Sequence, residues 1–381
     1  MMPTNILAGN RVRCGWRLAA IATGSVNRES MKPWEFWIDV GGTFTDCIAC
    51  SPEDDLVPLK VLSSAVTKGQ VQQVVGTDRL VDLSRTSDPA DFWVGYPLRC
   101  LDRDGHPLLE ATVTAFDVAT GRLTIDQVLP DSIQPGTTYE LVSPEEAPIL
   151  AIRHVLSLQL DEPIPEVSVR LGTTRGTNAL LTREGARTAL VTTNGFADVP
   201  LIGNQDRPRL FDLVIRKPEP LFERVIEVNE RIDADGNVLS SPQLQDVQQE
   251  LQAARDDGID SVAICLLHSF ANSDHEEQIE TAARAAGFTE VSRSSRLSPL
   301  IKIVSRTDTT LVDAYLNPIL RQYVTRLRGS LGDSSLKIMT SAGGLVDADR
   351  FVGKDSILSG PAGGVIGFSR VAERAGFDRS I

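Results

Sequence analysis

Apolar and polar residues alternate along residues 34–51, and this pattern predicts two strands joined by a short turn. The first strand covers residues 36–40 and the second covers residues 44–50. The turn between them, Gly41-Gly42-Thr43, is small and rich in backbone amides. Because glycine adopts positive φ without strain, such a turn can leave N–H groups uncovered for an anion. The segment therefore predicts a β-hairpin whose turn binds a phosphate.

The eight residues from Asp39 to Asp46, DVGGTFTD, supply the groups that a nucleotide site requires. Asp39 would hold hydrated Mg²⁺, and Asp46 would orient a water molecule, a threonine or the metal, so these two are the predicted catalytic residues. The predicted phosphate contacts are the N–H groups of Gly41, Gly42, Thr43 and Phe44 and the hydroxyls of Thr43 and Thr45. A plain hairpin turn with acidic ends is the alternative interpretation.

A second candidate anion site follows the strand predicted over residues 167–171. The loop that comes next, residues 172–178, is rich in hydroxyl groups and leads into a helix, whose first N–H groups have no partner within the helix. Arg175 would neutralise a phosphate or carboxylate there. The predicted substrate contacts of this loop are Thr173, Thr174, Arg175 and Asn178. Ordinary capping of the helix by a threonine is the alternative.

Two strands predicted near the C-terminus, residues 336–340 and 357–358, each lead into a turn of small residues. These turns would let a nucleotide approach the backbone closely, and close helix packing is the alternative. The glycines assigned to nucleotide binding are Gly343, Gly344, Gly363 and Gly364. A helix over residues 365–375 follows the second turn.

The remaining pattern predicts alternating strands and helices, and hence a mainly parallel sheet, over residues 189–287. A long helix opens at Arg306 and continues toward Arg328, with Asp308 or Thr309 as its cap and a kink or interruption at Asn317-Pro318. Residues 64–143 instead contain short alternating runs separated by Gly-rich turn signals, which predict a small antiparallel β module inserted before a helix over residues 147–156.

Composition excludes several functional classes. A net charge of −13 and a pI near 4.9 argue against nucleic acid or an anionic membrane surface as the partner. The five cysteines form no disulfide framework, and the four histidines show no zinc-ligand spacing. Residues 1–30 contain only a short apolar patch, so we expect a disordered leader and a cytoplasmic protein.

The octet DVGGTFTD resembles the first phosphate loop of the sugar kinase, Hsp70 and actin superfamily, and in particular the start of hydantoinase A and 5-oxoprolinase proteins. Five later blocks are similar to the same family in the same order: LGTTRGTNALLTREGA, RPRLFDL, DAYLNPIL, TSAGG and SGPAGGV. The resemblance implies an α/β, ribonuclease H-like nucleotide-binding fold. It also implies an N-terminal hydantoinase/oxoprolinase domain over residues 31–290, with the insert at 64–143, and the start of the next domain over residues 291–381.

In the family, the polar segment 203–212 is a loop that faces the cleft. The resemblance therefore implies that Arg207 or Arg209 contacts a substrate carboxylate through paired hydrogen bonds. A solvated loop is the alternative.

The resemblance implies ATP-dependent opening of 5-oxo-L-proline to L-glutamate, a reaction of the glutathione (γ-glutamyl) cycle, through phosphorylation of the ring carbonyl oxygen. The implied cofactors are ATP and Mg²⁺. The implied partners are a small-molecule substrate, a hydantoinase B-like region or subunit, and further copies of the chain. An N-methylhydantoinase A or acetone carboxylase subunit is a close alternative, and a non-catalytic nucleotide-binding fragment is a distant one.

The superfamily grips its nucleotide with two phosphate hairpins, and this sequence contains one, at Asp39–Asp46. The chain therefore resembles the N-terminal part of an oxoprolinase, and we expect it to be inactive alone.

Overall fold

The computed structural model describes residues 12–13, 32–204, 209, 211–215 and 217–379. The described chain forms two compact units. The first contains residues up to Arg175 together with residues 324–350 and 358–381, and the second contains residues 176–323 and 351–357. Most of the predicted leader lies outside the described residues. No helix in the described part is long and apolar enough to cross a membrane.

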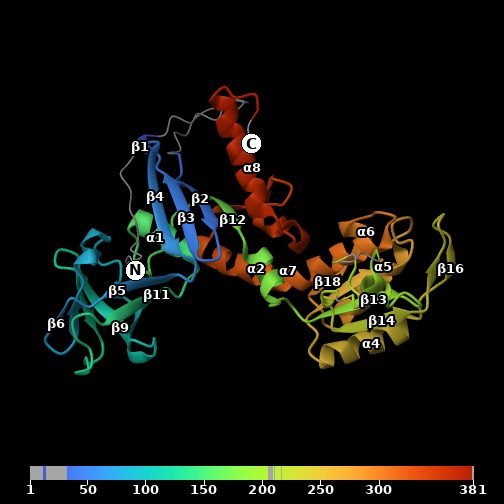
Figure 1. Cartoon of the computed structure of the whole chain (residues 1–381), viewed down its shortest axis with the longest axis horizontal. Helices are drawn as coiled ribbons and strands as arrows, with labels where there is room; N and C mark the ends of the chain where they lie inside the picture. Colours follow the sequence, from blue (N-terminus) through green and yellow to red (C-terminus); the bar gives the residue numbers. More distant parts are fainter. Residues whose placement is uncertain (1–11, 14–31, 205–208, 210, 216, 380–381) are drawn as a thin grey trace. The chain divides into compact units, whose positions relative to one another are not determined.

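The first unit is built on a mixed sheet of seven strands, four of which lie side by side in Figure 1 as β4, β3, β2 and β12. Strands β2 to β4 form an antiparallel meander, and β2, β12 and β19 run parallel to one another. In spatial order the strands are β1 (Val12–Arg13), β4 (Asp55–Leu62), β3 (Phe44–Cys50), β2 (Glu35–Val40), β12 (Ser168–Thr173), β19 (Ser335–Met339) and β20 (Leu345–Asp347). The predicted hairpin is thus confirmed.

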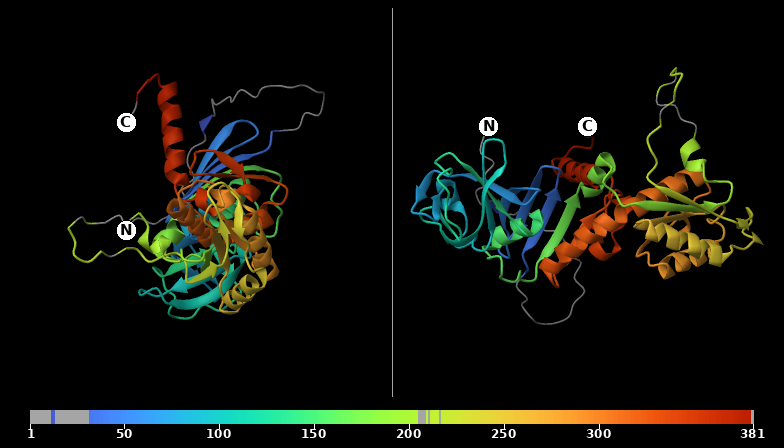
Figure 2. Two further views of the ribbon diagram at one scale, coloured as in Figure 1. Left: turned by 90° about the vertical axis from the view of Figure 1, so that its right-hand side faces the viewer. Right: turned by 90° about the horizontal axis from the view of Figure 1, so that it is seen from below.

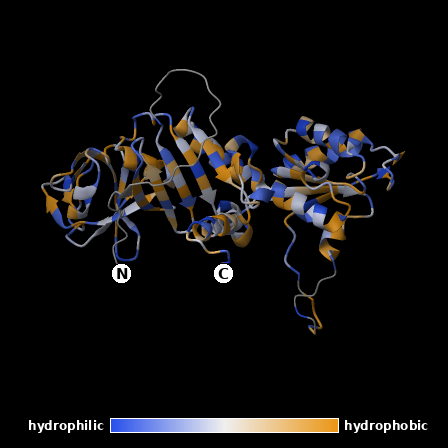
Figure 3. Cartoon of the chain, turned by 90° about the horizontal axis from the view of Figure 1, so that it is seen from above, coloured by the Kyte–Doolittle hydropathy of each residue, from blue (hydrophilic) through white to orange (hydrophobic). Residues whose placement is uncertain are grey.

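Alternation of side chains explains why the hairpin lies on the core. Phe36, Ile38 and Val40 are buried, whereas the residues between them are partly or fully exposed, and the alternating colours along the strands are visible in Figure 3. Helix α1 (Ala147–Leu156) packs against β2, β3 and β4 and spans the residues predicted for it. Cys47 and Cys50 are buried on the second strand of the hairpin and are not joined in a disulfide.

Residues 66–142 form a separate antiparallel sheet, coloured in blue-green tones in Figures 1 and 2, so the predicted β module is present. Its order is β5 (Val66–Gln70), β11 (Thr138–Val142), β8 (Pro97–Leu101), β9 (Pro107–Asp117), β10 (Arg122–Ile125), β7 (Arg79–Val81) and β6 (Gln73–Val75). Phe92 and Trp93 lie in a buried turn that precedes β8.

The second unit contains a four-stranded parallel sheet, as predicted. Its order is β14 (Arg224–Val228), β13 (Thr188–Thr193), β17 (Ser261–Cys265) and β18 (Glu290–Arg293). One apolar cluster joins this sheet to α4 (Leu244–Asp256) and α5 (Asp274–Ala285), and another includes Leu311 and Ala314 of α7. The smaller elements are α2 (Arg175–Thr182), α3 (Val199–Ile202), α6 (Ser294–Leu297) and the hairpin of β15 (Arg231–Ile232) and β16 (Val238–Ser240).

Helix α7 (Ile303–Leu331) differs from its prediction in two ways. It begins three residues before Arg306, so Asp308 and Thr309 lie inside the helix and do not cap it. It also continues through Pro318, so the expected interruption is wrong. Burial of the neighbouring residues Leu316 and Leu320 favours the helix despite the proline, because tertiary packing overrides local propensity.

Helix α8 (Ser359–Arg374) begins earlier than the sequence pattern indicates. Residues 357–358 are not a strand, and Gly363 and Gly364 belong to the helix instead of a turn. The buried Ser359 hydroxyl donates a hydrogen bond to the carbonyl oxygen of Thr173 at 3.0 Å, which fixes the helix start on β12. Pro361 is compatible with this start because a first-turn N–H has no partner within the helix.

Candidate functional site

The turn of the β2–β3 hairpin is braced by Ser63, which follows β4. The N–H of Ser63 donates to the carbonyl oxygen of Thr43 at 2.9 Å, and its hydroxyl donates to that of Gly41 at 2.8 Å. The N–H of Gly41 donates to the Phe44 carbonyl oxygen at 3.0 Å. That amide is therefore already used, and Gly42 and Thr43 form the exposed tip that a phosphate can reach.

Position 41 requires glycine because a side chain would not fit. The predicted positive φ is not found at Gly41, but a Cβ there would lie 3.0 Å from the Phe44 carbonyl oxygen. A side chain here would push the two sides of the turn apart. The tightness of the turn thus depends on glycine at position 41.

The two predicted catalytic carboxylates lie directly opposite each other. Asp39 of β2 pairs in register with Asp46 of β3, and Asp46 pairs with Lys60 of β4. An ion pair of 2.6 Å joins Asp46 Oδ1 to Lys60 Nζ. On the other side of Asp39 lies Gly172 of β12. The four residues therefore form one row across four adjacent strands, beside the turn.

The row gives the two carboxylates different environments. Lys60 neutralises Asp46, whereas Asp39 forms no ion pair with any described residue. Gly172 leaves room beside Asp39, since a Cβ there would lie only 3.0 Å from Asp39 Oδ1. An exposed carboxylate that forms no ion pair with a described residue suits a hydrated divalent cation. Asp39 thus fits the metal role predicted for it better than Asp46 does.

The threonines of the two candidate loops hold the hairpin in place. Thr45 is buried, and its hydroxyl lies 3.0 Å from that of Ser63. Thr174 donates to the Val40 carbonyl oxygen from its N–H at 3.0 Å and from its hydroxyl at 3.2 Å. Thr173 is also buried and accepts a hydrogen bond from the N–H of Arg175. The Thr173 hydroxyl thus has the capping contact that the alternative interpretation gave to a threonine, whereas the hydroxyls of Thr45 and Thr174 brace the hairpin, a role that the sequence did not predict.

The described residues predicted to bind substrate are divided between the two units. Arg175 pairs with Glu146, with 3.0 Å between Nη2 and Oε2. Asn178 lies in α2 and belongs to the second unit, as does the exposed Arg209. Arg207 lies outside the described residues. Their contacts with a substrate remain predictions.

Two of the C-terminal glycines, Gly343 and Gly344, lie in a turn, and the other two, Gly363 and Gly364, lie within α8. Gly343 has φ +81° in the turn between β19 and β20, and a Cβ there would lie 2.4 Å from the Ile366 side chain of α8. A Cβ on Gly363 would lie 3.8 Å from Met339 of β19. Close helix packing, the alternative interpretation, accounts for Gly343 and Gly363. Gly344 and Gly364 have open space beside them.

Sequence reasoning missed Ser63 and Lys60 as parts of the site. Each lies at or near the end of β4, the strand that follows the hairpin. Their role depends on the register of β3 against β4, and a single sequence carries no signal for that register.

Two family models match the chain. Residues 118–287 match the hydantoinase/oxoprolinase N-terminal region, and residues 306–381 match the hydantoinase/oxoprolinase model. The 5-oxoprolinase of Saccharomyces cerevisiae is 38% identical over 263 residues, which cover 59% of this chain and 20% of that protein. The chain spans about a fifth of the length of such curated relatives.

Two solved structures share the fold. The nucleotide-free structure of acetone carboxylase superimposes with a TM-score of 0.56 at 18% identity, covering 90% of this chain and 41% of that one. The ATP-dependent caprolactamase from Pseudomonas jessenii gives a TM-score of 0.55 at 23% identity, with the same coverage.

Proposed function

We propose a function from one premise: the chain belongs to the hydantoinase/oxoprolinase family. Its proposed function is to hold ATP in an enzyme that opens a cyclic amide, with 5-oxo-L-proline as substrate and L-glutamate as product. The name of the yeast relative supports this substrate, and the caprolactamase supports lactam chemistry in proteins of this fold. The proposal also places the reaction in the γ-glutamyl cycle.

The observation that carries the proposal is the row of Asp39, Asp46 and Lys60 beside the exposed hairpin tip. The backbone of Gly42 and Thr43 would contact the terminal phosphates, and Asp39 would hold Mg²⁺. Mg²⁺ would neutralise charge on the transferred phosphoryl group. The sheet order, with three antiparallel strands followed by two parallel ones, supports the ribonuclease H-like fold of the actin, Hsp70 and sugar-kinase superfamily.

In the proposed reaction the carbonyl oxygen of the lactam attacks the γ-phosphorus of ATP and ADP leaves. The resulting imidate phosphate is a better electrophile than the amide. Water then adds to the ring carbon and the carbon–nitrogen bond breaks, which leaves an acyl phosphate. A second water hydrolyses the acyl phosphate to glutamate and inorganic phosphate. The residues of this chain contribute by positioning the phosphates and excluding water from the transfer.

A substrate assay of the intact enzyme tests this function. ATP turnover is measured with 5-oxoproline, hydantoin or acetone as the second substrate, and we expect turnover to depend on 5-oxoproline alone. Dependence on hydantoin would favour an N-methylhydantoinase. Dependence on acetone would favour a carboxylase, the second candidate, to which the fold of acetone carboxylase gives support.

The chain by itself is expected to bind ATP·Mg²⁺ weakly and to release no glutamate. The reason is that it contains one phosphate hairpin, so that half of the donors to the γ-phosphate would come from elsewhere. Calorimetric titration with ATP·Mg²⁺ and an enzymatic assay for glutamate check the two parts separately. Glutamate release above background would contradict this prediction.

The remaining proposals concern the location, partners and oligomeric state of the protein. We propose a cytoplasmic enzyme that acts on a small molecule, works with a hydantoinase B-like region or subunit, and assembles as a homo-oligomer. Each proposal follows from family membership.

A further inference from the structure

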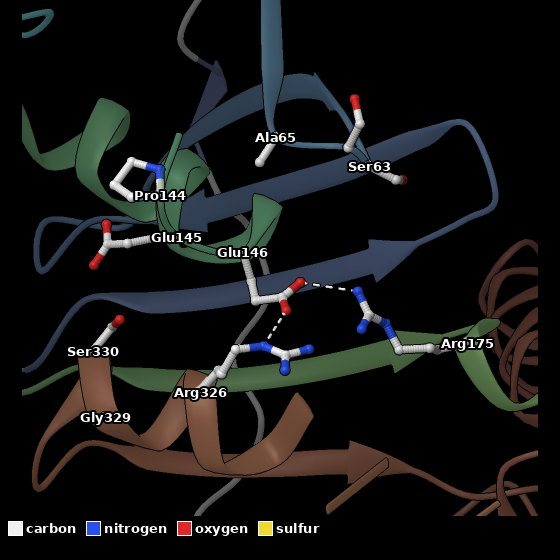
Figure 4. Close-up of a pocket in the computed structure, with 10 residues that line it drawn as sticks. Ser63, Ala65, Pro144, Glu145, Glu146, Arg175, Arg326, Gly329 and Ser330 are labelled. Atoms are coloured by element: carbon white, nitrogen blue, oxygen red, sulfur yellow. Dashed lines mark hydrogen bonds and ion pairs between the residues drawn. The ribbon is translucent and has the colours of Figure 1, made fainter. Parts of the chain in front are cut away.

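A pocket of about 510 Å³ lies in the first unit, at the root of the β module. Its walls come from four places that are distant in sequence: Ser63 after β4, Glu146 before α1, Arg175 at the start of α2, and Arg326 and Ser330 near the end of α7. Figure 4 shows Glu146 lying between the two arginines. The pocket shares Ser63 with the hairpin site and includes Arg175, a predicted substrate residue, but Asp39, the predicted metal ligand, is not among its lining residues.

The pocket carries more positive than negative charge. Glu146 Oε2 is 3.0 Å from Arg175 Nη2, and Glu146 Oε1 is 2.7 Å from Arg326 Nε. One carboxylate therefore serves two guanidinium groups. The neighbouring Glu145 does not correct the balance, because it is engaged by Arg153 at 2.6 Å and 3.1 Å. Counted together with Arg153, three guanidinium groups face two carboxylates, in a chain whose net charge is −13.

Arg326 has donors to spare. Its contact with Glu146 uses only Nε, and within the described residues Nη1 and Nη2 have no protein partner. Its side chain is 51% exposed, so these groups are reachable from the pocket. A guanidinium presents its remaining N–H groups in a planar fork, which matches the oxygens of a carboxylate or phosphate. Ser64 and Ser330 add hydroxyl groups to the wall.

We propose that this pocket binds a small organic or inorganic oxyanion, a carboxylate or a phosphate, through Arg326. The volume exceeds that of an inorganic ion and falls within the range of sites for small molecules. One negative charge on the ligand would balance the excess charge of the pocket. The same excess opposes the binding of a metal cation.

The test is calorimetric titration of the whole chain with sodium phosphate and with sodium L-glutamate, at an ionic strength kept constant with sodium chloride. At least one of the two anions is expected to bind, and its identity decides between phosphate and carboxylate. Arg326→Gln is expected to weaken that binding by about tenfold or more, because it removes a charge-assisted pair of hydrogen bonds. Arg326→Lys keeps the charge and loses the planar fork of N–H groups. Its affinity for the anion should lie between those of the wild type and Arg326→Gln.

Arg99→Gln is the matched control. Arg99 is an exposed arginine of β8 that pairs with Glu110 at 3.0 Å and lies outside the pocket, so its loss changes the net charge equally and should leave affinity unchanged. Circular dichroism confirms that each variant is folded. Phosphate that binds at the hairpin tip instead of in the pocket would bind equally well to Arg326→Gln. Equal affinity in wild type and Arg326→Gln, or no binding of either anion, would overturn the proposal without affecting the nucleotide site.

Discussion

Replacing Asp39 with asparagine is expected to lower ATP turnover of the intact enzyme by about 10²- to 10³-fold, the usual cost of removing one electrostatic group from a reacting centre. Asp39 is exposed beside the hairpin tip and forms no ion pair with any described residue. The amide retains the size of the side chain and loses the charge that holds Mg²⁺. Steady-state release of phosphate measures the effect.

Two controls make this prediction specific. Asp161→Asn changes the charge equally at an exposed loop residue after α1, and turnover should remain at the wild-type value. Asp46→Asn should have a smaller effect than Asp39→Asn, because Lys60 already neutralises Asp46. Thermal unfolding should be nearly unchanged in all three variants, since surface substitutions typically alter stability by less than about 0.5 kcal/mol. Wild-type turnover in Asp39→Asn would refute the assignment.

Replacing Asp88 with alanine is expected to destabilise the first unit by about 3 kcal/mol. Asp88 Oδ2 accepts hydrogen bonds from Arg85 at 3.1 Å and from Trp93 Nε1 at 2.7 Å, inside the β module. Arg85 is only 1% exposed, so the variant leaves a buried guanidinium with weaker compensation. Breaking a buried pair in this way typically costs about 3–5 kcal/mol. Asp82 lies 3.9 Å from Arg85 and still partly compensates its charge in the variant. We therefore expect a loss at the lower end of this range.

Urea unfolding followed by tryptophan fluorescence measures this change, because the described tryptophans Trp34, Trp37 and Trp93 all lie in the first unit. Asp131→Ala, at an exposed turn of the same module, is the matched control and should change the unfolding free energy by less than about 0.5 kcal/mol. If Asp88→Ala unfolds at the same urea concentration as the wild type, the buried pair makes no net contribution to stability. The side chain of Asp88 also lies 3.7 Å from His154 of α1, so the substitution removes a contact between the module and this helix as well.

Local sequence patterns determined the hairpin, helix α1 and the parallel sheet of the second unit. In each case the signal lies within a few neighbouring residues: alternation for β2 and β3, and turn glycines at the ends of helices such as α5. The proposal that this turn binds phosphate also follows from the sequence, because its glycines, threonines and aspartates lie within eight residues of one another. Local patterns of this kind can be interpreted without knowledge of the rest of the fold.

The tertiary structure alone decided which of these groups meet. The strand order places Gly172, Asp39, Asp46 and Lys60 in one row, and strand register has no local signature. Pro318 remains inside a helix because buried neighbours outweigh its propensity. The ion pairs of Glu146 join segments up to 180 residues apart. Contacts over such separations depend on how whole elements pack, and for that reason the charge of the pocket at Arg326 could not be predicted from the sequence.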